Sequence, residues 1–458
     1  MRHPVLTLGL TLLLACANDI REVPDSASIT DPTTSTTSTT GVPEDTGDRF
    51  DIGGGATEAI TMEGGEGGGC PPPTNANATL TGIVYAPNMQ IPISGAAVYL
   101  TRDPVEGVPD KVYCSKCVEL TCDTPFTLTN PDGTFELPAV AGAGQQLVVR
   151  KGEFQRIVDF DVVEGMNQVA PDQSNLPGEW NPDAGMWIPK IAVYETDPDR
   201  VFNVLAKFGL GEVTAGGALV PGTEQFALIG DDDQGAFMDD FLGMSEYHII
   251  FVPCAATKYW FGAPSVPLLR AQNIRDYVAA GGKWYATDHS NEYIEEPFAD
   301  YQEFHAPGMP DIQPAYDVDS TVVDEELLAW LDALSPELKN IGGGNPTLEA
   351  LPTVRTMLNY SGIEEVYPVI VQDEDGMDVD VGHRVWVEGP CSSCSDPQKI
   401  RPMAISGQWG CGRMMYSTFE NSSVAHPGLN PQELILLYMI LEISVCHEGM
   451  PPPPPPVG

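Results

Sequence analysis

Residues 247–253 read YHIIFVP, residues 264–282 read PSVPLLRAQNIRDYVAAGG, and residues 283–287 read KWYAT. The first and last of these runs are mainly apolar and have the length of buried strands. The middle run places apolar residues at helical spacing, and the glycine pair at its end stops a helix. A strand, a helix and a strand in this order predict two parallel strands joined by a right-handed crossover.

The same alternation of strand and helix patterns extends over residues 188–447. A buried strand is predicted at Lys190–Tyr194, and Asp197 is predicted to cap the helix after it. The last helix begins with Asn430 as its cap and Glu433 in a capping box. Further predictions are a helix at Thr321–Leu334, a hairpin of Val366–Val371 and Val381–Val387, and a late strand at Arg413–Phe419. Together these elements predict an α/β layered sheet.

Residues 77–170 carry short strands separated by turn signals, which is typical of a β-sandwich. Thr79–Tyr85 alternates as a half-buried strand does, and Asn130–Phe135 places Pro and Asp-Gly where a turn needs them. Residues 171–187 are rich in Pro, Gly and Asn, so they are predicted to be a linker. The predicted fold class is therefore multidomain, with an all-β sandwich followed by an α/β layered sheet.

The sandwich region resembles the carboxypeptidase regulatory-like domains, a transthyretin-like β-sandwich family. The matching stretches are Gly82-Ile83-Val84, Pro92–Val98, Asp132–Leu137 and Ala141-Gly142. The resemblance implies a non-catalytic module that serves binding, spacing or stability.

Residues 188–447 resemble the class I glutamine amidotransferase-like group, which is flavodoxin-like in architecture. The resemblance lies in the strands at 190–194 and 247–253, in the helix end and strand start at 274–283, and in the turn at Gly410–Arg413. It implies an open sheet with any site at the carboxyl ends of the parallel strands.

The two positions that carry catalysis in that group differ in this chain. Active members place a cysteine nucleophile in a Gly-x-Cys-x-Gly turn after a strand, and here the matched positions 287–291 read TDHSN. The late His-Pro-Glu element is replaced by Phe419-Glu420-Asn421. The resemblance therefore implies that this amidase machinery is absent.

Leu13-Leu14-Ala15-Cys16 closes a short apolar run that begins at Val5. The run is too short to span a bilayer as a helix, so residues 1–16 are predicted to be a cleaved export signal. The pattern resembles the lipobox of bacterial lipoproteins, which implies acylation of Cys16 and a lipid-anchored protein of the bacterial cell envelope. Ala17 directly after the cysteine resembles the pattern of enterobacterial lipoproteins that are sorted to the outer membrane, which implies an outer-membrane location. The alternative is an ordinary secretory signal with a chance cysteine.

Low-complexity segments flank the folded regions. Residues 17–76 are rich in Thr, Ser, Gly and Pro and are predicted to be a disordered tether. Residues 448–458 are predicted to be a polyproline tail. The whole arrangement resembles uncharacterised lipoproteins of myxobacteria, with a β-sandwich first and an amidotransferase-like domain second.

The charge of the chain is strongly acidic. It has 458 residues with 22 Lys and Arg against 65 Asp and Glu, which gives a formal net charge of −43. Such a surface repels nucleic acid and attracts cations, Ca²⁺ included. After the leader, no apolar stretch reaches about 18 residues, so no transmembrane helix is predicted.

Export favours disulfides for the cysteines that follow Cys16, and Cys254 stands apart from the others as an odd thiol. The disulfide candidates form two groups, Cys70, Cys114, Cys117 and Cys122, and Cys391, Cys394, Cys411 and Cys446. A disulfide-closed loop is predicted for the insert at Cys114–Cys122, in preference to a zinc site. Cys391 and Cys394 are predicted to close a small loop or to join a neighbouring cysteine.

Polar residues follow the predicted parallel strands where a site would lie. The catalytic candidates are Cys254, His289, Ser290, Glu420 and His426. A Cys or Ser nucleophile with a histidine base would make a hydrolase. Asp288, His289 and Glu420 could instead bind a metal, and a third interpretation is a polar sheet edge whose groups cap helices and satisfy one another. Tyr259-Trp260-Phe261 could form a rim for a glycan or peptide, or pack a loop.

An acidic turn lies between the two strands of the predicted hairpin. Asp373, Asp375, Asp378 and Asp380 surround Gly376 and could bind Ca²⁺ through oxygen ligands, or form a solvated hairpin tip.

The leading functional hypothesis is a membrane-anchored envelope lipoprotein that acts as a non-enzymatic binding or structural module, with an envelope protein or a glycan as its partner. The alternative is an envelope hydrolase that uses Cys254, His289 and Glu420.

Overall fold

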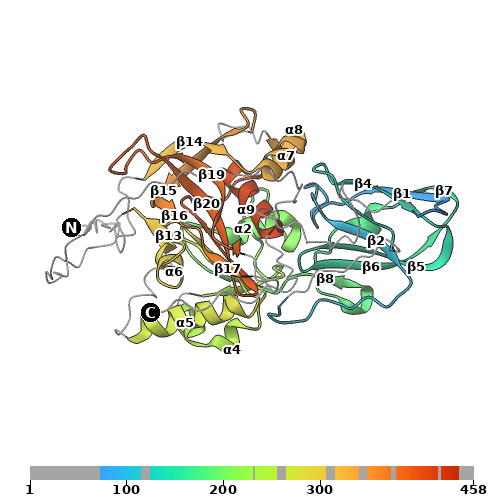
Figure 1. Cartoon of the computed structure of the whole chain (residues 1–458), viewed down its shortest axis with the longest axis horizontal. Helices are drawn as coiled ribbons and strands as arrows, with labels where there is room; N and C mark the ends of the chain where they lie inside the picture. Colours follow the sequence, from blue (N-terminus) through green and yellow to red (C-terminus); the bar gives the residue numbers. More distant parts are fainter. Residues whose placement is uncertain are drawn as a thin grey trace, which may run out of the picture. The chain divides into compact units, whose positions relative to one another are not determined.

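The computed structural model of the chain describes residues 73–114, 124–230, 233–254, 265–305, 315–339, 348–372, 378–420 and 424–442. This part of the chain forms a multidomain, β-rich fold with several sheets (Figure 1). The predicted signal peptide, almost all of the tether and the polyproline tail lie outside the described residues. So do Cys16, Cys70, Cys117, Cys122, Tyr259, Trp260, Phe261, Asp373, Asp375 and Cys446.

Two sheets near the start of the described chain share one hydrophobic core. In the first, β1 (Ala78–Ile83) pairs antiparallel with β4 (Thr134–Ala139) and parallel with β7 (Gly165–Gln168). The second has the order β3 (Phe126–Leu128), β2 (Ala97–Thr101), β5 (Gly142–Lys151), β6 (Phe154–Val162) and β8 (Met186–Trp187). Leu80 of the first sheet and Leu147 of the second are fully buried in the same core. The all-β prediction for this region is confirmed.

The residues predicted as a linker, 171–187, are instead structured. They form helix α1 (Pro171–Ser174), a short 3₁₀ helix at Pro182–Ala184, and β8, which pairs antiparallel with β6. The prediction was wrong here because Pro, Gly and Asn mark turns inside a domain as well as between domains. The partner of β8 lies about 30 residues earlier in the chain, beyond the reach of local patterns.

The larger sheet is mixed. Its order is β10 (Ala227–Ile229), β9 (Ile191–Tyr194), β11 (Ile249–Val252), β12 (Lys283–Thr287), β21 (Gly412–Ser417), β20 (Ile400–Trp409), β19 (Arg384–Pro390), β14 (Tyr316–Val322) and β15 (Thr353–Asn359). The first five strands run parallel to one another, and the remaining pairs are antiparallel. The parallel part contains the predicted unit, with β11 and β12 as direct neighbours.

Helices cover the two faces of this sheet. Because side chains alternate along a strand, Ile250 and Val252 of β11 pack with helix α5 (Ser265–Ala279), whereas Ile249 and Phe251 belong to the opposite core. That opposite core contains α2 (Val201–Leu205), α7 (Glu325–Ala333) and α9 (Pro431–Glu442). The smaller elements are α3 (Gln234–Asp239), α4 (Phe241–Met244), α6 (Glu292–Glu295), α8 (Pro336–Lys339), β13 (Gln302–Phe304) and β16 (Ile363–Val366).

The start of α9 and the end of α5 lie where the sequence predicts them, because the capping residues and the glycine there have their expected roles. The capping box of α9 is present, since Asn430 Oδ1 accepts the Glu433 N–H at 2.8 Å and Glu433 Oε2 accepts the Asn430 N–H at 2.8 Å. After α5, Gly281 adopts a φ of +114°, and a Cβ there would lie 2.0 Å from the Tyr113 carbonyl oxygen. Glycine is therefore required at position 281 for both conformation and space.

Three predicted elements differ from the structure. Tyr316–Val322 is strand β14 with alternating burial, and α7 begins only after Asp324, whose side chain accepts the Leu327 N–H. The predicted helix at Thr321–Leu334 is therefore too long. The hairpin across the acidic turn is β17 (Ile370–Gln372) with β18 (Asp378–Asp380), whereas most of the predicted Val381–Val387 segment belongs to β19 and pairs with β14 and β20. Helix α2 begins at Val201, and Asp197 does not cap it.

The sandwich and the larger sheet are joined by buried polar contacts. Lys283 Nζ at the start of β12 lies 2.5 Å from Glu153 Oε1 in the sandwich, and both side chains are buried. The Trp330 indole N–H donates to the Pro92 carbonyl oxygen at 2.8 Å. A disulfide links Cys114 to Cys411. We call this set of contacts the joint.

Candidate functional site

Three polar side chains meet where neighbouring parallel strands end. Cys254 follows β11, Asp288 follows β12, and Glu420 lies shortly after β21. Strand β12 lies between β11 and β21, so these three ends are adjacent. The thiol sulfur and one carboxylate oxygen from each acid all lie within 4.8 Å of one another, and all three residues are buried. We call these three residues the edge cluster.

The turn after β12 directs Asp288 into the edge cluster. Asp288 has a φ of +49°, which is uncommon for a residue other than glycine, and it begins a short 3₁₀ helix at Asp288–Ser290. Its Oδ1 accepts the backbone N–H of Tyr360 at 2.8 Å. The next backbone N–H, that of His289, is directed at the Cys254 thiol. The turn thus presents one carboxylate and one N–H to the same small volume.

A further carboxylate supports the edge cluster from behind. The Cys254 backbone N–H donates to Thr287 Oγ1 at 2.8 Å, and that hydroxyl donates to Asp199 Oδ2 at 2.6 Å. Asp199 is fully buried. Asp199 was not predicted from the sequence, because it lies five residues after the end of β9, farther from its strand than Cys254 lies from β11. Tyr360 was also missed, because it follows the antiparallel strand β15 and carries no comparable signal.

Burial and like charges shape the protonation of this site. Burial is the main reason that the pKa of the Cys254 thiol is raised, and the negative charges of Asp288 and Glu420 add to the effect. Burial is the main reason that the pKa of Glu420 rises to about 8, and the negative charge of Asp199 is the second reason. A hydrogen bond with Cys254 opposes that rise. A thiol whose pKa is raised is a poor nucleophile, because the thiolate is the reactive form.

The side chains of the other catalytic candidates contact groups outside the edge cluster. The His289 ring stacks on Tyr360 with ring centroids 4.7 Å apart. Ser290 Oγ donates to the Pro253 carbonyl oxygen at 2.7 Å and serves the backbone. His426 Nε2 lies 3.3 Å from Glu433 Oε1 and 3.4 Å from Lys207 Nζ, in a different cluster. Of the five candidates, Cys254 and Glu420 have side chains in direct contact.

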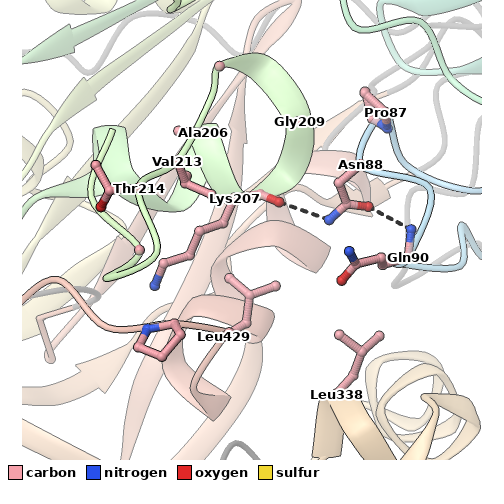
Figure 2. A pocket seen from close by; sticks show the side chains of 14 residues that line it. Pro87, Asn88, Gln90, Ala206, Lys207, Gly209, Val213, Thr214, Leu338 and Leu429 are labelled. Atoms are coloured by element: carbon pink, nitrogen blue, oxygen red, sulfur yellow. Dashed lines mark hydrogen bonds between the residues drawn. The ribbon is translucent and has the colours of Figure 1, made fainter. Parts of the chain in front are cut away.

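A cavity of about 500 Å³ lies beside that second cluster (Figure 2). Its walls come from the sandwich loop at Pro87–Gln90, from residues of Ala206–Thr214, and from Leu338 and Leu429. Figure 2 shows Asn88 bridging the two sides, since its Nδ2 donates to the Lys207 carbonyl oxygen and its Oδ1 accepts the Gln90 N–H. Lys207 Nζ is 2.8 Å from Glu433 Oε1, so its charge is neutralised within the protein.

The acidic hairpin tip is only partly described. Asp380 Oδ1 accepts the backbone N–H groups of Val369 and Gly382 at 2.8 and 2.9 Å, so this carboxylate stabilises the hairpin. Asp378 is exposed. Asp373 and Asp375 lie outside the described residues, and the Ca²⁺ site stays a prediction.

The cysteines form two disulfides among the described residues. Cys391 pairs with Cys394, as the small-loop alternative predicted. Cys114 pairs with Cys411, which lies 297 residues away, so this cysteine does not pair within the insert. Cys117 and Cys122 lie outside the described residues, and the rest of that prediction stays a prediction. Cys254 is a free, buried thiol, as expected from its isolation.

Comparisons with known proteins place few limits on the chain. No family profile and no curated protein matches the sequence. Two cytoplasmic proteins of Salmonella typhimurium are similar in structure, with 11% and 9% identity, TM-scores of 0.31, and coverage of 56% and 57% of this chain and 98% and 100% of theirs. A β-galactosidase of Bacillus circulans sp. alkalophilus shows 12% identity and a TM-score of 0.25, covering 56% of this chain and 30% of its own. These scores are too low to assign a fold or a function.

Among the helices in the described ranges, none combines the length and the apolar character that crossing a bilayer requires.

Proposed function

We propose that this chain is a lipid-anchored protein of the bacterial cell envelope, placed at the outer membrane, whose folded part is a non-enzymatic binding or structural module. Cys16 and the apolar run before it support the anchor. We also propose that the nine-stranded sheet belongs to the flavodoxin-like, class I glutamine amidotransferase-like architecture. Its run of parallel neighbours β9, β11, β12 and β21 supports this assignment.

One observation carries the non-enzymatic part of the proposal. The turn after β12, matched to the nucleophile turn of the resembled group, has no cysteine: its positive-φ residue is Asp288, and the position matched to the cysteine is His289. Neither a carboxylate that accepts a backbone N–H nor an imidazole replaces a cysteine in acyl transfer of that kind. The free thiol beside it, Cys254, is buried and has a raised pKa, which opposes nucleophilic attack.

The joint supports a structural or binding role for the described part as one body. A buried ion pair, an indole hydrogen bond and a disulfide connect the sandwich to the larger sheet. Such connections hold two surfaces in a fixed relation, which suits recognition of a partner that contacts both.

The absence of enzymatic activity is tested by labelling the full chain, purified in detergent, with thiol-directed and serine-directed activity probes. We expect no labelling of the folded parent by either probe above that of Cys254→Ala. Labelling that disappears in Cys254→Ala while Cys391 and Cys394 remain paired would favour the hydrolase alternative instead.

The anchor is tested by expression of the full chain in a bacterial host supplied with labelled palmitate. We expect the label in the parent and none in Cys16→Ser, which should move to the soluble fraction. A Cys16→Ser variant that stays in the membrane fraction would refute the lipid anchor. Density separation of the two membranes then tests the outer-membrane assignment.

A further inference from the structure

The edge cluster has the donor set of a metal site. Cys254 offers sulfur, and Asp288 and Glu420 each offer a carboxylate oxygen, with all three ligand atoms within 4.8 Å of one another. Two donors bound to one tetrahedral ion at zinc-like bond lengths lie about 3.5 Å apart. The three side chains therefore need to close by only about 1 Å to share an ion.

The Glu420 carboxylate supplies a second and independent observation. Glu420 is 4% exposed, and its Oε2 is buried with no hydrogen-bond partner among the residues that the structure describes. Buried carboxylate oxygens are normally paired, so an unpaired one calls for an explanation. A cation coordinated at this point would pair it.

The charges around the cluster also favour a cation. Asp199 lies behind Cys254 through the Thr287 hydroxyl, so three carboxylates surround one thiol. Within the described ranges, the charged groups that act on this thiol are Asp288, Glu420 and Asp199. Each is an acid, and a divalent ion would offset their mutual repulsion.

Neighbouring groups already hold two of the three ligands in place. The Tyr360 N–H fixes Asp288 through Oδ1, and Thr287 fixes the backbone of Cys254. Such support behind the ligands is typical of metal centres, where it orients the donor atoms.

We propose that Cys254, Asp288 and Glu420 bind one divalent transition-metal ion of the zinc and iron class. The sulfur donor excludes Ca²⁺ and Mg²⁺, which take oxygen ligands, while the two carboxylates disfavour Cu(I). The thiol proton of Cys254 and the carboxyl proton that Glu420 holds at neutral pH are both released to solvent on binding. His289, predicted from sequence as a ligand with Asp288 and Glu420, has its ring on Tyr360, and Cys254 takes its place. This inference goes beyond the anchored module and holds whether or not the anchor does.

The experiment uses the full chain in detergent, treated with a chelator and then titrated with Co²⁺ alone. We expect one Co²⁺ per chain and a thiolate-to-cobalt charge-transfer band in the near ultraviolet. Cys254→Ala should lose the band, and Glu420→Gln should lower the affinity for Co²⁺ at least tenfold. The matched control is Asp319→Asn, an exposed carboxylate on β14 of the same sheet, which should bind as the parent does.

Thermal unfolding separates a lost site from a lost fold. Glu420→Gln keeps the size of the side chain, so without metal it should unfold as cooperatively as the parent. Added Zn²⁺ should raise the unfolding temperature of the parent and not that of Glu420→Gln. Two results would overturn the proposal: a parent that takes up no stoichiometric Co²⁺ or Zn²⁺, in which case a proton on Glu420 satisfies the site, or uptake that survives in both variants.

Discussion

Two buried glutamates in this molecule have pKa values shifted in opposite directions, and the difference separates a structural contact from a candidate site. Burial alone would raise the pKa of Glu153, but Lys283 opposite lowers it below its usual value. Glu420 is just as buried, yet it faces Asp199 and Cys254, and its pKa rises to about 8. The joint thus carries its own counter-charge, whereas the edge cluster does not. A buried carboxylate with no cation beside it among the described residues can be neutralised by a bound metal ion or by a proton.

The largest expected effect comes from breaking the neutralised pair. Lys283→Met leaves Glu153 buried without its cation, which should lower the free energy of unfolding by about 3–5 kcal/mol. Urea denaturation of the full chain measures this change. The double variant Lys283→Met/Glu153→Leu should recover most of the loss. A single variant that loses less than about 1 kcal/mol would show that the pair is not desolvated.

The covalent part of the joint gives the next effect. Cys114→Ser together with Cys411→Ser removes a disulfide that closes a long loop, which should cost about 3 kcal/mol of unfolding free energy. Removal of the short Cys391–Cys394 loop is the matched control and should cost less, because it constrains few residues of the unfolded chain. Equal losses from the two removals would contradict this explanation. The measurement is denaturant unfolding under non-reducing conditions.

His383, a half-buried histidine that stays neutral, adds a third case to the comparison of the two glutamates. Burial lowers the pKa of His383 to about 3, and its Nε2 lies 2.7 Å from Gln302 Oε1. Between pH 6.5 and 3 the unfolded chain binds a proton that the folded chain does not, so stability falls as the pH drops. The loss should be about 2 kcal/mol, less than the full shift implies, because His383 is only half-buried.

His383→Gln tests this dependence. The variant should show a shallower loss of stability from pH 6.5 to pH 3 than the parent, measured by urea denaturation at each pH. Parallel curves for the two proteins would assign the acid sensitivity to other groups.

The smallest effect is expected at the edge cluster. In the chelator-treated chain, Glu420→Gln should change the free energy of unfolding by about 1 kcal/mol or less, because it removes no pairing charge. This small change in the free energy of unfolding contrasts with the large loss expected for Lys283→Met. If Glu420→Gln lowered the free energy of unfolding of the metal-free protein as much as Lys283→Met does, Glu420 would have to pair with a group outside the contacts described above.

Local patterns were sufficient where one stretch of chain determines its own structure. Strand β12 matches its prediction residue for residue, and the capping box at Asn430 placed the start of α9. The edge cluster was also predictable in part, because parallel strands end at one edge of a sheet. That rule selected Cys254 and Glu420 without any knowledge of their contact.

Long-range features were beyond those patterns. The Cys114–Cys411 disulfide depends on how the insert meets the turn after β20, and no spacing encodes that meeting. Residues 316–322 alternate as a strand, but the apolar residues that follow also fit a helix, so the boundary was placed too early. The position of the His289 ring was also beyond local patterns, because the ring lies against Tyr360, a residue that follows another strand.

Strand β12 connects the two regions compared above in a mechanical sense. Lys283 begins the strand at the joint, and Asp288 follows its last residue at the edge cluster, so the two lie about 17 Å apart along the chain. On either side β12 is bonded along its length to parallel neighbours, β11 and β21. A shift of Lys283 along the strand direction would act on both rows of hydrogen bonds at once. The joint and the edge cluster are therefore linked through one strand that is held on both sides.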